Sequence, residues 1–281
     1  MKNKTLYVSD MDGTLLGPDS RVSARSAEII SGLSRSGAEI TVATARTPAT
    51  VVPLLADTYT RPDAVVMTGS ARWHRYPGHY DAVHFMPEAD VVAGLEMCRR
   101  LGVHPFVYTL DADGAMLQVY HGAGAMNKAE ENFYIERARL TLKRFHNGTP
   151  LPVSALPRTM LFFAMGERGR VEDAAAALRE GTDCSVCCYP DIFNHDVANL
   201  EVFAPGVSKA SAVLELKKSV GADRLVVFGD NLNDLPMFAV ADVAVAVENA
   251  FTEVKEHADV VIGPNYTDSV ANYILHDYTC E

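Results

Sequence analysis

The chain has 281 residues, a length that suits two compact domains better than one. Hydrophobic residues make up 48% and charged residues 22%, which is ordinary for a globular protein. The formal net charge of −11 argues against a general binder of nucleic acids or anionic membranes, because both are polyanions. A small phosphorylated metabolite stays open as a partner, since a few local cations and a metal ion can hold one phosphate.

The five cysteines are too few and too scattered to form a disulfide framework. The N-terminus lacks the apolar run and the small-residue cleavage site of a signal peptide. No apolar run approaches the roughly 18 residues of a membrane span. We therefore expect a cytoplasmic protein without a membrane partner, and the sequence carries no signal for its oligomeric state.

Short apolar runs that end abruptly at polar residues predict strands buried on both faces, as in parallel sheets. Between them, two amphipathic segments predict helices, the first with a serine at its N-cap and both ending near a glycine. This alternation predicts an α/β fold with a doubly wound, Rossmann-like parallel sheet as its core. The expected strands are 6–8, 40–43, 64–67, 225–228, 243–247 and 260–262, and the expected helices are 23–36 and 208–220.

The middle of the chain reads differently and predicts an inserted α+β cap domain. We expect the core at 1–81 and 199–281, and the cap at 82–198. The expected strands of this part of the chain are 82–86, 105–109, 115–120, 160–165 and 185–189, with a last one at 200–203 just past the cap edge. The expected helices are 88–101, 128–144 and 170–179. A hairpin turn is expected at 111–114 and a loop at 145–157.

Two aspartates leave the first strand in the sequence Asp10-Met11-Asp12-Gly13-Thr14. Gly13 permits a turn that brings both carboxylates to one site. One carboxylate can then attack while its neighbour handles a proton. The alternative is a solvated turn at a strand end, which is common for an isolated pair of this kind.

A second acidic motif, Gly229-Asp230-Asn231-Leu232-Asn233-Asp234, directly follows another apolar run. Ligands in doubly wound sheets lie at the carboxyl ends of strands, where this motif and Asp10 both fall. Mg²⁺ prefers oxygen ligands and keeps several waters, so one or two carboxylates suffice to hold it. The alternative, an acidic loop that caps the following helix, is weaker because Asp10 is expected at a neighbouring strand end.

Together the two motifs resemble those of the haloacid dehalogenase-like phosphatases, most closely the Cof-type branch with its large α/β cap. The resemblance implies that Asp10 attacks phosphorus and becomes an aspartyl-phosphate, while Asp12 protonates the leaving oxygen and later activates water. It also implies Mg²⁺ as cofactor, bound by the Asp10 carboxylate, the Asp12 carbonyl and the Asp230 carboxylate. Asp234 would bind it through water or support it from behind.

The same resemblance assigns the remaining motifs. Thr44, at the end of the second strand, would bind the transferring phosphoryl group with its hydroxyl and the following amide. Ala45 stands where the family often has glycine, and Arg46 is either a substrate contact or half of a structural ion pair. Lys209 would stabilise charge on Asp10, although an isolated lysine is usually just solvated. Asn233 would donate to the phosphate.

The expected function is thus Mg²⁺-dependent hydrolysis of phosphate monoesters of small metabolites, with sugar phosphates as the leading class. A phosphomutase of the phosphomannomutase type is an alternative, because it uses the same aspartyl-phosphate and a related cap. A non-catalytic phospho-acceptor module is a further alternative, since receiver domains also carry a phosphorylated aspartate, but they are far smaller and need no Asp12.

Overall fold

The computed structural model describes residues 4–76, 78–122, 126–191 and 194–280. The chain divides into a core unit, Met1–Asp81 with Ser208–Glu281, and a cap unit, Ala82–Val207. The chain re-enters the core beyond the expected residue 198, because β11 (Val197–Phe203) pairs along its whole length within the cap sheet. Within these residues, no helix has both the length and the apolar character needed to cross a membrane.

The core unit is built on a five-stranded sheet in the order β14-β13-β12-β1-β2, and every neighbouring pair is parallel. Every residue of β1 is buried, which explains why its sequence is a run of apolar and small residues rather than an alternation. The predicted α/β fold is confirmed. The strands are β1 (Thr5–Ser9), β2 (Glu39–Val42), β12 (Arg224–Gly229), β13 (Val243–Val247) and β14 (Val260–Ile262).

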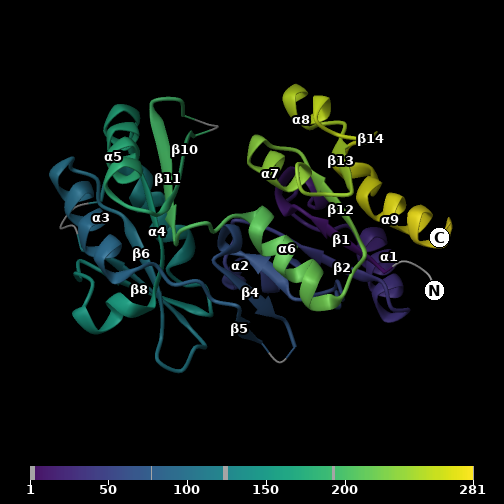
Figure 1. The fold of residues 1–281 in the computed structure, drawn as a ribbon, viewed down its shortest axis with the longest axis horizontal. Coiled ribbons are helices and arrows are strands. Elements are labelled where there is room, and N and C mark those ends of the chain that lie inside the picture. The colour runs from purple at the N-terminus through teal and green to yellow at the C-terminus, as the bar shows by residue number, and fades with distance from the viewer. Residues whose placement is uncertain (1–3, 77, 123–125, 192–193, 281) are drawn as a thin grey trace. The chain divides into compact units, whose positions relative to one another are not determined.

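Helices lie on both sides of this sheet, with α6 on one side and the adjacent α1 and α9 on the other (Figure 1). The Ser23 side chain caps α1 by accepting from the amide of Ser26, and α6 ends where Gly221 adopts a φ of 66°. The core helices are α1 (Ala24–Arg35), α2 (Pro48–Leu54), α6 (Lys209–Val220), α7 (Leu235–Phe238), α8 (Thr252–Glu256) and α9 (Ser269–Cys280).

A second, antiparallel sheet in the core unit was not expected from the sequence. It contains β3 (Ala64–Val66), β4 (Ala71–His74) and β5 (His79–Asp81). Trp73 is buried in it, and its ring lies 4.9 Å from that of Tyr80 in an edge-on contact. The strand expected at 82–86 is wrong, because the pairing with β4 ends at Asp81 and Ala82 takes a φ of 45°.

The cap unit holds a six-stranded mixed sheet in the order β10-β11-β9-β6-β7-β8. The helix expected at 128–144 ends at Arg137, and the chain then forms β8 parallel to β7, where Phe145 packs against Phe106 and Tyr134. The cap strands are β6 (Phe106–Leu110), β7 (Leu117–His121), β8 (Lys143–Asn147), β9 (Thr159–Glu167), β10 (Ser185–Pro190) and β11. The cap helices are α3 (Glu88–Arg100), α4 (Lys128–Arg137) and α5 (Arg168–Gly181).

Candidate active site

Asp10 and Asp230 follow two strands that lie side by side in the core sheet. Residue Ser9 of β1 pairs with Phe228 of β12, and the amide of Asp10 donates to the carbonyl of Phe228 at 2.9 Å. Because the strands are parallel, both chains leave the sheet at the same edge. The two motifs at opposite ends of the sequence therefore meet through backbone pairing alone.

The turn after β1, Met11–Leu15, fits tightly against the second motif. Gly13 has a φ of 76°, and a Cβ atom there would collide with the Asp230 carboxylate. Thr14 Oγ1 donates to Asp230 Oδ1 at 2.8 Å, and Asn249 Nδ2 donates to the Gly13 carbonyl at 2.8 Å. The sequence placed Thr14 in the first motif without predicting a role for it, and nothing in the sequence pointed to Asn249.

Lys209 joins the carboxylates from the first turn of α6, whose N-cap is Ser208. Its Nζ donates to Asp10 Oδ1 at 2.6 Å and to Asp234 Oδ1 at 2.9 Å. All three side chains are buried: Lys209 is 3% exposed, Asp10 7% and Asp234 0%. The other Asp234 oxygen accepts from the backbone amides of Asp230 and Asn231, at 3.1 and 3.2 Å. Asp234 therefore holds both Lys209 and the loop that carries Asp230.

The electrostatics of this cluster are dominated by burial. Burial raises the pKa of Asp10 to about 7, against the lowering effect of Lys209 and with a further rise from Asp234. Burial likewise raises the pKa of Asp230 to about 6, although its hydrogen bond from Thr14 lowers it. Burial alone would lower the pKa of Lys209, but Asp10 and Asp234 raise it above its usual value. One lysine thus leaves three neighbouring carboxylates incompletely neutralised.

The donor set fits a hard divalent cation. Asp10, Asp230 and Asp234 each present one carboxylate oxygen within 4.8 Å of the others. Mg²⁺ takes oxygen ligands of this kind, and a second positive charge would offset the remaining repulsion among the carboxylates. A role for the Asp12 carbonyl as a further ligand stays a prediction.

Arg46 binds Asp12 rather than standing free. Its Nε and Nη2 donate to the two Asp12 carboxylate oxygens at 2.7 and 2.6 Å. The Asp12 side chain is 54% exposed and that of Arg46 28%. Hydrogen bonds to Asp12 raise the pKa of Arg46, although its burial lowers it. Arg46 was expected to be either a substrate contact or half of an ion pair. The structure shows the ion pair, and its partner is Asp12, the expected proton donor.

The remaining expected site residues are Thr44, Ala45 and Asn233. Among the described residues, none of them makes a hydrogen bond to Lys209 or to the three clustered aspartates. Thr44 is buried after β2, and its hydroxyl accepts from the Arg46 amide at 3.2 Å. Ala45 is exposed. Asn233 is exposed in the turn Leu232–Asp234. Their roles toward a phosphate stay predictions.

Comparison with known proteins points to one family. The model of the haloacid dehalogenase-like hydrolases matches residues 7–274 of the chain. A pyridoxal phosphate phosphatase of Escherichia coli (strain K12) is 25% identical over 272 residues, covering 94% of this chain and 95% of that protein. A 5-amino-6-(5-phospho-D-ribitylamino)uracil phosphatase of Bacillus subtilis (strain 168) is 38% identical over 88 residues. That second match covers 31% of this chain and spans 35% of the relative's own length.

The fold also has solved counterparts. A haloacid dehalogenase-like hydrolase from Bacteroides thetaiotaomicron superposes with a TM-score of 0.76 at 20% identity. The superposition covers 98% of this chain and 100% of that one. At 20% identity this likeness shows the fold alone. The chemistry has to be inferred from the residues at the site.

Proposed function

This chain belongs to the haloacid dehalogenase-like hydrolases, as its two aspartate motifs predicted, and we propose that it acts through a phosphoryl group carried transiently on Asp10. Its family and its relatives make it a phosphoric monoester hydrolase. The observation that carries the proposal is the convergence of buried Asp10, Asp234 and Lys209 with half-buried Asp230 in one cluster.

Asp10 has the surroundings that a nucleophilic carboxylate needs. Lys209 donates to its Oδ1, which holds the side chain in one orientation. Its Oδ2 makes no hydrogen bond to any residue that the structure describes, so this oxygen is the one available to attack phosphorus. The O–P bond to Asp10 forms as the bond to the leaving alcohol breaks, and water then splits the acyl-phosphate to return the free carboxylate.

Asp12 is the proposed proton donor and acceptor. It protonates the alkoxide that leaves in the first half-reaction and takes a proton from water in the second. Arg46 now binds both of its oxygens, so proton donation requires that this ion pair open. A phosphate dianion is a stronger partner for a guanidinium than a carboxylate, and substrate would therefore compete for Arg46.

Mg²⁺ is the proposed cofactor. The Asp10 and Asp230 carboxylates and the Asp12 carbonyl would bind it, and Asp234 would bind it through water or support the other ligands. When bound, it supplies positive charge where an anionic carboxylate meets an anionic phosphate. The chain's own contribution is to orient these carboxylates: Lys209 donates to Asp10 and Asp234, and Thr14 donates to Asp230.

The proposed substrates are phosphate monoesters of small metabolites, with sugar phosphates as the first class to test. The two relatives named above act on small phosphorylated metabolites, which supports this size of substrate. We also propose a reducing, cytoplasmic setting, which the free thiols of all five cysteines support.

The test is a panel of phosphorylated metabolites and p-nitrophenyl phosphate, assayed as released inorganic phosphate with Mg²⁺ and with excess EDTA. We expect turnover only with the metal and a loss of at least ~10³-fold in Asp10→Asn. Asp57→Asn, a matched change at an exposed turn of the core, should turn over normally. Acid quenching should trap a phosphorylated peptide that contains Asp10.

Two results would redirect the proposal. Transfer of the phosphoryl group to a second sugar hydroxyl, in place of phosphate release, would favour the phosphomutase. Full activity in Asp10→Asn would remove the covalent mechanism altogether.

A further inference from the structure

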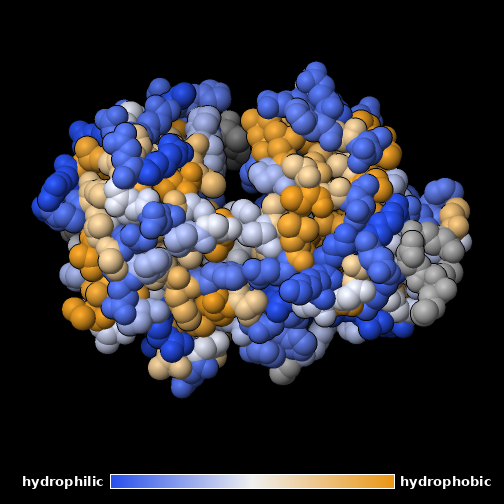
Figure 2. All heavy atoms as spheres, in the orientation of Figure 1, coloured by the Kyte–Doolittle hydropathy of each residue, from blue (hydrophilic) through white to orange (hydrophobic). Residues whose placement is uncertain are grey.

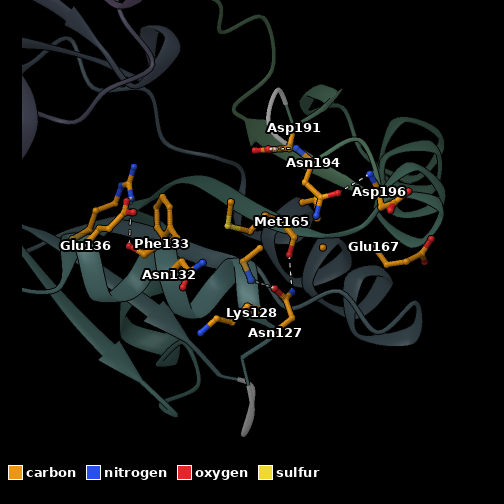
Figure 3. Close-up of a pocket in the computed structure, with 14 residues that line it drawn as sticks. Asn127, Lys128, Asn132, Phe133, Glu136, Met165, Glu167, Asp191, Asn194 and Asp196 are labelled. Carbon is orange, nitrogen blue, oxygen red and sulfur yellow. Dashed lines mark hydrogen bonds and ion pairs between the residues drawn. The ribbon is translucent and has the colours of Figure 1, made fainter. Parts of the chain in front are cut away.

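A cavity lies within the cap unit, between α4, the end of β9 and four residues after β10, namely Asp191, Asn194, Asp196 and Val197 (Figure 3). Its volume is about 680 Å³, within the ~300–1,000 Å³ range of small-molecule sites. On the face that Figure 2 shows, hydrophobic and polar residues are interspersed, so hydropathy alone does not mark this site.

The wall between α4 and β9 is built by Asn127. Its Oδ1 caps α4 by accepting from the amides of Ala129 and Glu130, at 2.9 and 3.0 Å. Its Nδ2 donates to the carbonyl of Met165 on β9 at 2.9 Å, and the carboxylate of buried Glu130 accepts from the backbone amide of Asn127 at 2.7 Å. The cavity is therefore formed before any ligand enters it, as small-molecule sites usually are.

The middle of the cavity is apolar. Figure 3 shows Phe133 and Met165 between α4 and the loop that carries Asp191 and Asn194. The Phe133 ring is held by aromatic neighbours, with ring centroids 5.0 Å from Phe106 and 4.8 Å from Phe163. The Arg137 guanidinium also lies over this ring, with its Cζ 4.3 Å from the ring centroid. The remaining ring surface, beside the flexible thioether of Met165, suits the flat or apolar part of a ligand.

The charges around this apolar centre are unbalanced. Four carboxylates line the cavity against two cations, namely Glu136, Glu167, Asp191 and Asp196 against Lys128 and Arg137. Both cations already bind carboxylates of α4 itself, Arg137 to Glu136 at 2.6 Å and Lys128 to Glu131 at 3.3 Å. The Asp196 carboxylate, in contrast, has no hydrogen bond or ion pair with any residue in the described parts of the chain.

We propose that this cavity binds small organic molecules that carry an ammonium or hydroxyl group beside an aromatic or apolar part, and that it rejects organic anions. The donor group binds the Asp196 carboxylate, and the apolar part lies on Phe133 and Met165. The Asn132 side-chain amide, which makes no hydrogen bond within the described residues, offers a further donor and acceptor. All residues that line the cavity belong to the cap unit, and none of them is assigned a part in the proposed phosphatase reaction, so this site goes beyond that reaction.

The test uses the full chain and three phosphate-free probes that share one phenol ring: tyramine, tyrosol and 4-hydroxyphenylacetate. They carry a cation, a neutral hydroxyl and an anion at the same position. Titration calorimetry at ~0.15 M salt, where surface charges are screened beyond ~8 Å, should rank tyramine first and tyrosol second. We expect tyramine to bind at least tenfold tighter than 4-hydroxyphenylacetate.

Variants then locate the binding. Asp196→Asn should remove the tenfold preference for tyramine over 4-hydroxyphenylacetate. Met165→Ala should weaken the binding of tyramine and of tyrosol by similar factors. Asp113→Asn, an exposed carboxylate of the cap hairpin turn, is the matched control and should change nothing. Asp230→Asn should also leave tyramine binding unchanged, which separates this cavity from the acidic cluster of the core. Equal affinity for the three probes, no binding, or a preference that survives in Asp196→Asn would overturn the proposal.

Discussion

Asp12, which forms a bidentate ion pair with Arg46, is proposed to transfer a proton in both halves of the reaction. Replacing it should therefore affect the two half-reactions differently for different leaving groups. In Asp12→Asn, no carboxyl is left to protonate a leaving alkoxide, so alkyl phosphates should turn over ~10²–10⁴-fold more slowly. p-Nitrophenolate leaves without a proton, so the first half-reaction should survive with that substrate while the second stalls. Rapid mixing should show a burst of p-nitrophenolate followed by slow turnover.

The result that contradicts this assignment is equally specific. If Asp12→Asn slows alkyl and p-nitrophenyl phosphates by the same factor and gives no burst, then Asp12 is not the proton donor. Its bond to Arg46 would then be the whole of its role, as a positioning contact at the edge of the site.

Lys209 lies between Asp10 and Asp234, and its removal would leave buried carboxylates without a counter-charge. Breaking a buried pair from one side typically costs ~3–5 kcal/mol, so urea unfolding of Lys209→Met should show a loss of that size in EDTA. Mg²⁺ should restore part of the loss, because it brings positive charge to the same oxygens. The double variant Lys209→Met/Asp234→Asn should be more stable than Lys209→Met alone.

Lys217 supplies the matched control for that measurement. It pairs with Asp242 at 2.7 Å on the surface, and both side chains reach solvent. Exposed pairs contribute roughly 0–1 kcal/mol, so Lys217→Met should change the free energy of unfolding by no more than that. An equal loss in the two variants would mean that Lys209 acts through its methylene packing rather than its charge.

Among the elements, the start of α6 is set by its contact with the turn after β3. Gly69 has a φ of 98°, and a Cβ atom there would collide with the Ser208 carbonyl at the N-cap of α6. Gly69→Ala should therefore cost ~1–3 kcal/mol and lower kcat, since it displaces the helix turn that carries Lys209. Thermal unfolding and steady-state kinetics on the same sample measure both effects.

Replacing a glycine in α1 is the control that distinguishes this specific contact from the general effect of a glycine-to-alanine change. Gly32 lies inside α1 with no atom near its would-be Cβ and with ordinary helical φ. Gly32→Ala should raise stability by up to ~1 kcal/mol and leave kcat unchanged. A normal kcat in Gly69→Ala would show that α6 holds Lys209 independently of this contact.

Uniform burial made the two strands that carry the site predictable from the sequence. β1 and β12 are apolar runs because both of their faces are covered, and each delivers an aspartate to the same edge of the sheet. β4 and β8 escaped prediction because their burial is mixed, buried and half-buried in β4 and buried to exposed in β8, and their pairing depends on chain segments elsewhere. The same holds at the site, where Asn249 reaches Gly13 and Arg46 reaches Asp12 across loops whose courses no local pattern encodes.

For the whole molecule, metal binding and folding should be coupled. A ligand that binds only the folded state stabilises it by RT ln(1 + [L]/Kd), which is ~2.7 kcal/mol at a hundredfold excess over Kd. For a chain of this length each kcal/mol moves Tm by ~2–4 °C, so saturating Mg²⁺ should raise Tm by roughly 5–10 °C. Thermal melts in increasing MgCl₂, with NaCl at matched ionic strength as the reference, measure this rise.

The variants decide whether that rise comes from the proposed cluster or from the acidity of the chain as a whole. A net charge of −11 attracts any divalent cation, and such diffuse attraction should depend on ionic strength and survive the loss of one carboxylate. Binding at the cluster needs specific oxygens, so Asp230→Asn should abolish the rise in Tm while Asp57→Asn keeps it. If both variants respond to MgCl₂ like the parent chain, the ion is held elsewhere. The carboxylates around Lys209 would then stabilise the core by their hydrogen bonds alone, without a resident metal.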